Sequence, residues 1–124
     1  MKRVSEENII ELDDSTICEI EQAVDTHTFP IQSDLFYEGQ IPIVGYLLLD
    51  GHVQMLRNKK VKAIISKGTL FGVKELMTNS PSHYSAQILP GTKVCFLDKS
   101  SVLEFIEKHQ GQDIGELFQK LIKT

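Results

Sequence analysis

The sequence of 124 residues contains no tryptophan, only two cysteines and no long apolar run. Cys18 and Cys95 lie far apart without CxxC spacing, so we interpret them as free thiols in a reducing compartment. No stretch approaches the roughly 20 apolar residues that a membrane-spanning helix needs, and the charged N-terminus does not resemble a signal peptide. We therefore expect a cytoplasmic protein without a membrane partner.

An excess of positive charge is also missing, because the formal net charge is -4 at pH 7. Nucleic-acid-binding domains usually carry a basic surface, so the composition gives no support for a nucleic-acid partner. The hydrophobic fraction of 41% and the charged fraction of 24% are typical of a folded globular protein. One domain over residues 1–124, with a core of its own, is expected.

The usual catalytic motifs are absent as well. The four histidines are scattered and form no HxH pair, which argues against a histidine-ligated metal site. No serine lies in a GxSxG turn, neither cysteine neighbours a histidine, and no P-loop ending follows Gly68 or Gly72. The sequence therefore predicts a protein that is not an enzyme and has neither a metal nor a cofactor.

The charges that are present are unevenly distributed. Residues 1–25 carry eight acidic residues, whereas residues 57–74 carry six basic residues and no acidic one. The pattern over residues 57–74 predicts strands around a turn, so we expect these charges on one exposed hairpin. They either keep an edge strand from aggregating or form a docking surface for an acidic partner. The candidate partner-binding residues are Arg57, Lys59, Lys60 and Lys62.

Residues 5–26 form the first of three blocks and are predicted to be helical. Asp13 or Asp14 can cap a helix in which Ile17, Ile20 and Val24 recur at helical spacing. A shorter helical turn before it would begin at Ser5, with two glutamates favourable near its N-terminus.

Residues 29–98 form the second block, in which short apolar runs alternate with turn residues. Tyr46–Leu49 ends at an Asp-Gly turn, and Val61, Ala63 and Ile65 alternate with their neighbours. Several short strands at this spacing predict an antiparallel β-barrel or jelly roll. Within it, residues 72–77 are mostly good helix formers and predict one short helix.

Residues 100–124 form the third block and are predicted to contain two helices separated by Gly111. Ser101 with Glu104, and Asp113 with Glu116, can each form a capping box. The last helix has an apolar stripe made of Ile114, Leu117, Phe118, Leu121 and Ile122. We expect this stripe to pack on the barrel, and the alternative is a homodimer through the C-terminal helices.

Several fragments in this order resemble the cyclic-nucleotide-binding domain family, the effector module of catabolite-activator-type regulators, kinase regulatory subunits and gated channels. They are Leu35–Gln40 (LFYEGQ), Tyr46–Val53 (YLLLDGHV), Lys67–Gly72 (KGTLFG), Pro81, and Lys93–Leu97 with Asp98. The resemblance implies a mainly β fold: an antiparallel barrel with N-terminal helices and two C-terminal helices. It also implies that residues 67–72 open a phosphate-binding cassette.

The cassette departs from the family pattern at two ligand positions. Nucleotide-binding members have a glutamate for the ribose 2′-hydroxyl after Phe-Gly, and an arginine for the cyclic phosphate after the proline. These positions are Val73 and Ser82 here, and a shift of one or two residues reaches only His83 or Tyr84. The resemblance therefore implies a degenerate cassette, with the candidate ligand-binding residues Phe71, Gly72, Val73, Lys74, Ser82, His83, Tyr84 and Ser85.

The energetic cost of these two departures is large. An unpaired buried charge costs about 3–5 kcal/mol, and an unsatisfied ribose hydroxyl adds about 1–3 kcal/mol. Affinity in the usual binding mode would fall by roughly three decades or more. Glu75 is not expected to replace the missing glutamate, because two residues along a helix turn its side chain about 200° away.

We therefore predict a regulatory adaptor domain that presents the hairpin and the C-terminal helices to a signalling protein. The alternative is a sensor of cyclic AMP or cyclic GMP in which helix N–H groups, Lys74, Ser82 and His83 form a non-standard phosphate site. No DNA-binding domain is expected. The last helix has only Lys120 and Lys123 as cations, and the sequence ends at Thr124 without a helix-turn-helix segment.

Overall fold

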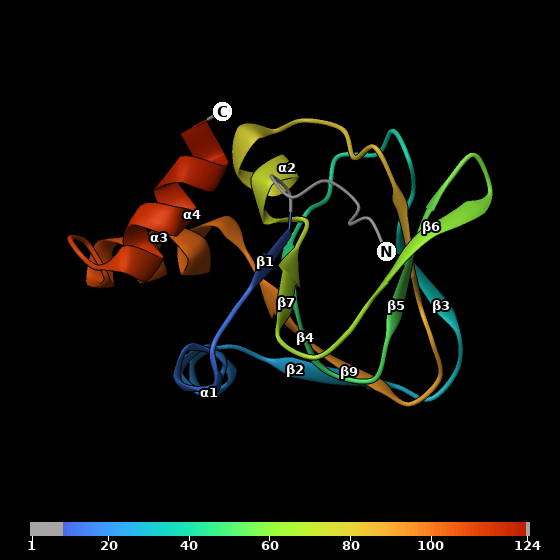
Figure 1. Cartoon of the computed structure of the whole chain (residues 1–124), viewed down its shortest axis with the longest axis horizontal. Helices are drawn as coiled ribbons and strands as arrows, with labels where there is room; N and C mark the ends of the chain where they lie inside the picture. Colours follow the sequence, from blue (N-terminus) through green and yellow to red (C-terminus); the bar gives the residue numbers. More distant parts are fainter. Residues whose placement is uncertain (1–8, 124) are drawn as a thin grey trace.

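The computed structural model describes residues 9–123, so the helical turn predicted at Ser5 lies outside the described residues (Figure 1). The strands are β1 (Ile9–Glu11), β2 (Thr26–Phe29), β3 (Ser33–Phe36), β4 (Gly45–Asp50), β5 (Val53–Arg57), β6 (Lys60–Ile65), β7 (Thr69–Phe71), β8 (Ser85–Ile88) and β9 (Thr92–Leu97). The helices are α1 (Asp14–Ala23), α2 (Val73–Thr78), α3 (Lys99–Lys108) and α4 (Asp113–Lys123).

The strands form two antiparallel sheets that face each other. The five-stranded sheet has the order β1-β7-β4-β9-β2, and the four-stranded sheet has the order β3-β8-β5-β6. Within residues 9–123, the outermost strands of each sheet pair with a neighbour on one side only. The arrangement is therefore a two-sheet jelly roll rather than a closed barrel. Helices α3 and α4 lie beside the five-stranded sheet, away from the four-stranded sheet (Figure 1). The predicted mainly β fold with flanking helices is confirmed.

Two hydrophobic clusters share the strands of the five-stranded sheet. In β4, Leu47 and Leu49 face the cluster under the helices, whereas Tyr46 and Leu48 face the cluster between the two sheets. This alternation follows from the two-residue period of a strand. Because both faces of β4 are buried, its sequence is continuously apolar rather than alternating.

The first predicted block is correct for its main helix and wrong at its beginning. Asp13 caps α1, since its carboxylate oxygen Oδ1 accepts a hydrogen bond from the backbone N–H of Thr16 at 2.8 Å. Residues 9–11, however, are a strand that pairs with β7, Ile9 lying opposite Phe71. Both isoleucines of this strand are buried, one in each cluster, so tertiary packing overrides the local pattern.

The C-terminal helices lie where the sequence predicted them, but their caps differ from the prediction. Helix α3 begins after Asp98, whose Oδ1 accepts from the backbone N–H of Ser101 at 2.8 Å, so the predicted cap at Ser101 is wrong. Helix α4 begins at Asp113 as expected. The backbone N–H of Glu116 donates to the carbonyl oxygen of Gln112 at 3.0 Å, so Gln112 and not Asp113 is at the cap position. At the corner between them, a Cβ at position 115 would collide with the carbonyl group of His109, so glycine allows the close approach.

Two further expectations concern membranes and thiols. None of the described helices is long and apolar enough to cross a membrane. Both cysteines are free, as predicted; Cys18 is exposed on α1, and Cys95 is buried in β9. Burial raises the pKa of the Cys95 thiol to about 11, and the nearby negative charge of Glu21 adds to this effect.

Candidate functional site

The cassette consists of β7, α2 and the loop that leads to β8. Gly72 connects β7 to α2 with a φ of +77°, a left-handed conformation that favours glycine. A Cβ at this position would lie 3.4 Å from Cδ1 of Tyr46, so the backbone passes close to the aromatic side chains between the sheets. The predicted short helix over residues 72–77 is present as α2.

Val73 occupies the position at which the resemblance implies the ribose-binding glutamate. Its side chain is 0% exposed and belongs to the cluster under the helices, not to the cluster between the sheets. The contact with Gly45 of β4 is tight, because a Cβ there would lie 2.5 Å from Cγ2 of Val73. The structure therefore uses position 73 as part of the hydrophobic core.

Ser82 occupies the position at which the resemblance implies the phosphate-binding arginine. The residue is 5% exposed, and its hydroxyl bonds to the backbone of Tyr84. The hydroxyl donates to the Tyr84 carbonyl oxygen at 2.7 Å and accepts from the Tyr84 N–H at 3.1 Å. The backbone of Ser82 is also bonded, to Gly39 and Gln40 at 2.7 and 2.9 Å. This side chain stabilises the cassette loop rather than facing an open pocket.

Aromatic side chains fill the space between the sheets next to the cassette. The ring centroids of Phe36 and Tyr46 are 5.7 Å apart, and those of Tyr46 and Phe71 are 5.2 Å apart in a stacked arrangement. Burial raises the pKa of Tyr46 to about 12. Two surface hollows lie elsewhere, one between α1 and α3 and one beside α1, β4 and β9. Lys67 lines the second hollow, and none of the eight candidate ligand-binding residues lines either.

The charged residues of the cassette differ in how deeply they are buried. Lys74 is half-buried, His83 is exposed, and Glu75 is 6% exposed on α2. Burial raises the pKa of Glu75, and the nearby positive charges of His83 and Lys74 partly oppose this shift. The burial of Glu75 could not be predicted from the sequence, because helical periodicity gives the direction of its side chain relative to Val73 but not the residues that surround it.

Tyr84 and Ser85 connect the cassette to the basic hairpin. The guanidinium carbon of Arg57 lies 5.9 Å from the centroid of the Tyr84 ring, within cation–π range. The hydroxyl of Ser85 accepts from the backbone N–H of Glu38 at 2.9 Å, and Oε1 of Glu38 accepts from the N–H of Asn58 at 3.1 Å. No local sequence pattern predicts these contacts, because they join residues far apart in the chain.

The basic hairpin is formed by β5 and β6 with a two-residue turn at Asn58 and Lys59. Both turn residues have positive φ, as a turn that follows the right-handed twist of the strands requires. The four candidate partner-binding residues, Arg57, Lys59, Lys60 and Lys62, are all exposed.

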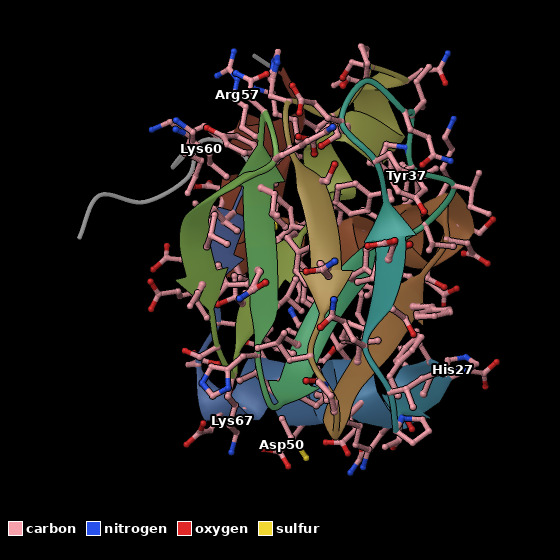
Figure 2. The ribbon with its side chains drawn as sticks, turned by 90° about the vertical axis from the view of Figure 1, so that its right-hand side faces the viewer. His27, Tyr37, Asp50, Arg57, Lys60 and Lys67 are labelled. Atoms are coloured by element: carbon pink, nitrogen blue, oxygen red, sulfur yellow. The ribbon has the colours of Figure 1, made fainter. Side chains whose placement is uncertain are left out.

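The basic residues of segment 57–74 do not all share this hairpin, as the sequence analysis expected. Arg57 and Lys60 lie at one end of the four-stranded sheet, and Lys67 lies at the opposite end (Figure 2). Lys74 belongs to α2 and not to the hairpin. The shared hairpin therefore carries only the four cations at the β5–β6 end.

A separate charged cluster lies at the corner between α1 and α3. Nε2 of His109 is 2.6 Å from Oε2 of Glu19, and Nδ1 is 2.7 Å from Oε1 of Gln112. The contact with Gln112 and then that with Glu19 raise the pKa of His109. Within residues 9–123, no group of three potential ligands from His, Cys, Asp and Glu is arranged to hold a metal ion.

Comparison with known proteins agrees with the resemblance seen in the sequence. The model of the cyclic nucleotide-binding domain family matches residues 26–109, which is more than half of the chain. No curated protein sequence is a significant match.

Several solved structures are similar in fold. The catabolite activator protein of Thermus thermophilus is 20% identical with a TM-score of 0.70, over 89% of this chain and 52% of that chain. This chain therefore spans about half the length of that activator. A protein of a cyclic-GMP-dependent signalling pathway that regulates bacterial phytopathogenesis is 10% identical with a TM-score of 0.75, over 90% and 92% of the two chains. The N-terminal domain of a transcriptional regulator from Streptomyces coelicolor A3(2) is 20% identical with a TM-score of 0.64, over 90% and 78%.

Proposed function

Because the chain belongs to the cyclic nucleotide-binding domain family, a regulatory family, we propose that it is a non-catalytic adaptor domain with a degenerate cassette. In this role it does not bind cyclic nucleotides in the usual way. It presents the basic hairpin to a signalling protein in the cytoplasm. The proposal includes no enzymatic activity, no nucleic-acid partner and no membrane partner.

The observation that carries the proposal is the placement of Val73 and Ser82. Val73 is packed against Gly45 in the core, and the hydroxyl of Ser82 is bonded to the backbone of its own loop. The resemblance implies a carboxylate that binds the ribose and a guanidinium that binds the phosphate. Val73 and Ser82 provide neither group. A cyclic phosphate placed here would lack its counter-charge, at a cost of about 3–5 kcal/mol.

The alternative, a sensor with a non-standard phosphate site, receives less support from the same geometry. It needs Ser82, Lys74 and His83 to converge on one anion. Ser82 is committed to Tyr84, while His83 is exposed. The buried carboxylate of Glu75 lies close enough to His83 and Lys74 for their charges to act on it, and it would repel a phosphate there.

The hairpin is the surface that the proposal assigns to a partner. Its four cations are exposed, and Glu38, Ser85 and Tyr84 connect the hairpin to the cassette loop. The C-terminal helices are the second surface. Phe118 and Leu121 of α4 are buried in the cluster under the helices, while Leu103 and Leu117 stay exposed. Packing on the domain thus accounts for most of the apolar stripe, and a homodimer would have to use the exposed leucines.

Calorimetric titration of the full chain with cyclic AMP and then cyclic GMP, at low salt, tests the proposal. We expect no saturable heat up to millimolar nucleotide. A dissociation constant below roughly 10 μM, about -7 kcal/mol, would contradict the degenerate cassette. If such binding is found, Lys74→Ala and His83→Ala identify the sensor alternative, because both substitutions should then abolish it.

A further inference from the structure

Strand β6 is an edge strand of the four-stranded sheet. It is the last strand in the order β3-β8-β5-β6, and β5 is its only neighbour in the part of the chain that the structure describes. The backbone N–H and C=O groups on the outer side of an edge strand are available to an added strand. Figure 2 shows the four-stranded sheet from its outer side, with β6 at its margin. Its six residues offer about 20 Å of edge.

The side chains of β6 make this edge amphipathic. Ala63 and Ile65 are buried and contribute to the cluster between the sheets. Val61 and Ile64 are exposed by 49% and 46%. These β-branched side chains favour strand pairing, and an added strand would cover part of their exposed surface.

The charge along the edge is of one sign. Lys60 and Lys62 lie on β6, and Arg57 and Lys59 complete the group at the turn. Glu38 is an acidic residue that contacts this turn, and its Oε1 accepts a hydrogen bond from the backbone N–H of Asn58 at 3.1 Å. An added strand that carries acidic side chains would therefore meet Lys60 and Lys62 along the first half of β6, with Arg57 and Lys59 at the adjacent turn.

Charge also distinguishes between two strands that could pair with this edge, a second copy of β6 and an acidic strand of another protein. A second copy of this chain would bring the same four cations to the same margin, so two β6 strands would repel each other at low salt. The lysines thus act against self-pairing, which is a common use of lysine on edge strands. They leave an acidic strand as the complementary occupant.

We propose that β6 is the site at which the partner docks, by adding an extended acidic segment of about six residues to the four-stranded sheet. The inference rests on the proposed function, in which the basic hairpin is the partner surface. It goes further because it states the chemistry of the partner segment and the backbone pairing by which that segment is held.

The test uses a fluorescent probe peptide in which glutamate and valine alternate, titrated into the full chain and followed by anisotropy. We expect saturable binding that weakens as salt is added. Amide hydrogen exchange with and without the peptide should show added protection in residues 60–65. A peptide that differs only in having two central valines replaced by proline should bind at least tenfold more weakly, because proline lacks the N–H that the ladder needs.

The protein variants separate strand addition from general charge attraction. Lys60→Glu with Lys62→Glu should weaken binding at least tenfold, whereas Lys67→Glu, at the opposite end of the sheet, should change it less than twofold. Absence of binding at millimolar peptide, equal binding of the proline peptide, or binding without protection of residues 60–65 would each overturn the proposal. These outcomes are independent of the nucleotide titration. The proposal of a degenerate cassette is therefore tested separately from the proposal of strand addition.

Discussion

The cassette and the basic hairpin are neighbours that differ in the exposure of their key side chains. Those at the two ligand positions of the cassette are buried or bonded internally, whereas those of the hairpin are exposed to solvent. In the cassette, position 73 is part of the core, and the hydroxyl of Ser82 is bonded within its own loop. In the hairpin, the cations of Arg57, Lys59 and Lys60 remain exposed. We propose that the family's fold is kept while the two positions that would hold the ligand serve internal contacts. In this proposal the hairpin is the surface that recognises a partner.

The largest loss of folding stability is expected for Val73→Glu. A carboxylate at this fully buried position would face Gly45 and the core without a counter-charge, at a cost of about 3–5 kcal/mol. Urea denaturation followed by circular dichroism measures the loss. A decrease below 1 kcal/mol would show that position 73 can turn toward a pocket, and the distinction between the two regions would fail.

A smaller loss is expected for Ser82→Ala. The substitution removes both hydrogen bonds to the Tyr84 backbone in a buried loop, which costs about 1–3 kcal/mol. Ser100→Ala is the matched control, because Ser100 is exposed at the start of α3. Equal stabilities of the two variants would mean that the hydroxyl of Ser82 is free to bind a ligand.

The contact between His109 and Glu19 lies outside both regions and serves as a reference for stability. We expect it to contribute about 1 kcal/mol or less to the free energy of unfolding. The folded-state pKa of His109 is raised, so the protonated form stabilises the fold fully below pH 6.5, the ordinary pKa. This contribution is lost as the pH rises through the folded-state pKa.

The matched variant for this contact is Glu19→Gln, which removes the carboxylate at 2.6 Å and should flatten that part of the pH profile. Urea denaturation at several pH values measures the change. An unchanged profile would show that the α1–α3 contact does not depend on the charge of His109.

The smallest effect on stability is expected for the hairpin. Lys60→Glu with Lys62→Glu should change the free energy of unfolding by less than about 0.5 kcal/mol, because both side chains are exposed and neither is part of a described core. Urea denaturation again provides the measurement. A loss of several kcal/mol would show that these cations serve the fold and not a partner.

The sequence predicted what depends on local pattern. The strand at Tyr46–Leu49 was predicted from its apolar run, and a cap at Asp13 or Asp14 was predicted from a carboxylate before a helical pattern. The structure has the cap at Asp13. Residues 9–11 were predicted incorrectly, because their strand exists only through pairing with β7, sixty residues later. At α3, the cap was predicted at Ser101, but Asp98, which is also a good capping residue, is the observed cap.

The candidate site was predicted in composition but not in arrangement. The missing carboxylate and guanidinium could be seen at positions 73 and 82. The tight contact of Val73 with Gly45, and the bonds from Glu38 to Ser85 and Asn58, depend on packing between distant segments. No spacing along the chain encodes such contacts, so their discovery required the structure.

The most direct test of the degenerate cassette is a two-dimensional amide NMR titration of the full chain with cyclic AMP. The degenerate cassette predicts that the resonances of residues 71–85 stay in place up to millimolar nucleotide. Saturable shifts confined to these residues, with half-saturation at micromolar nucleotide, would contradict it and make the domain a nucleotide sensor with an unconventional phosphate site.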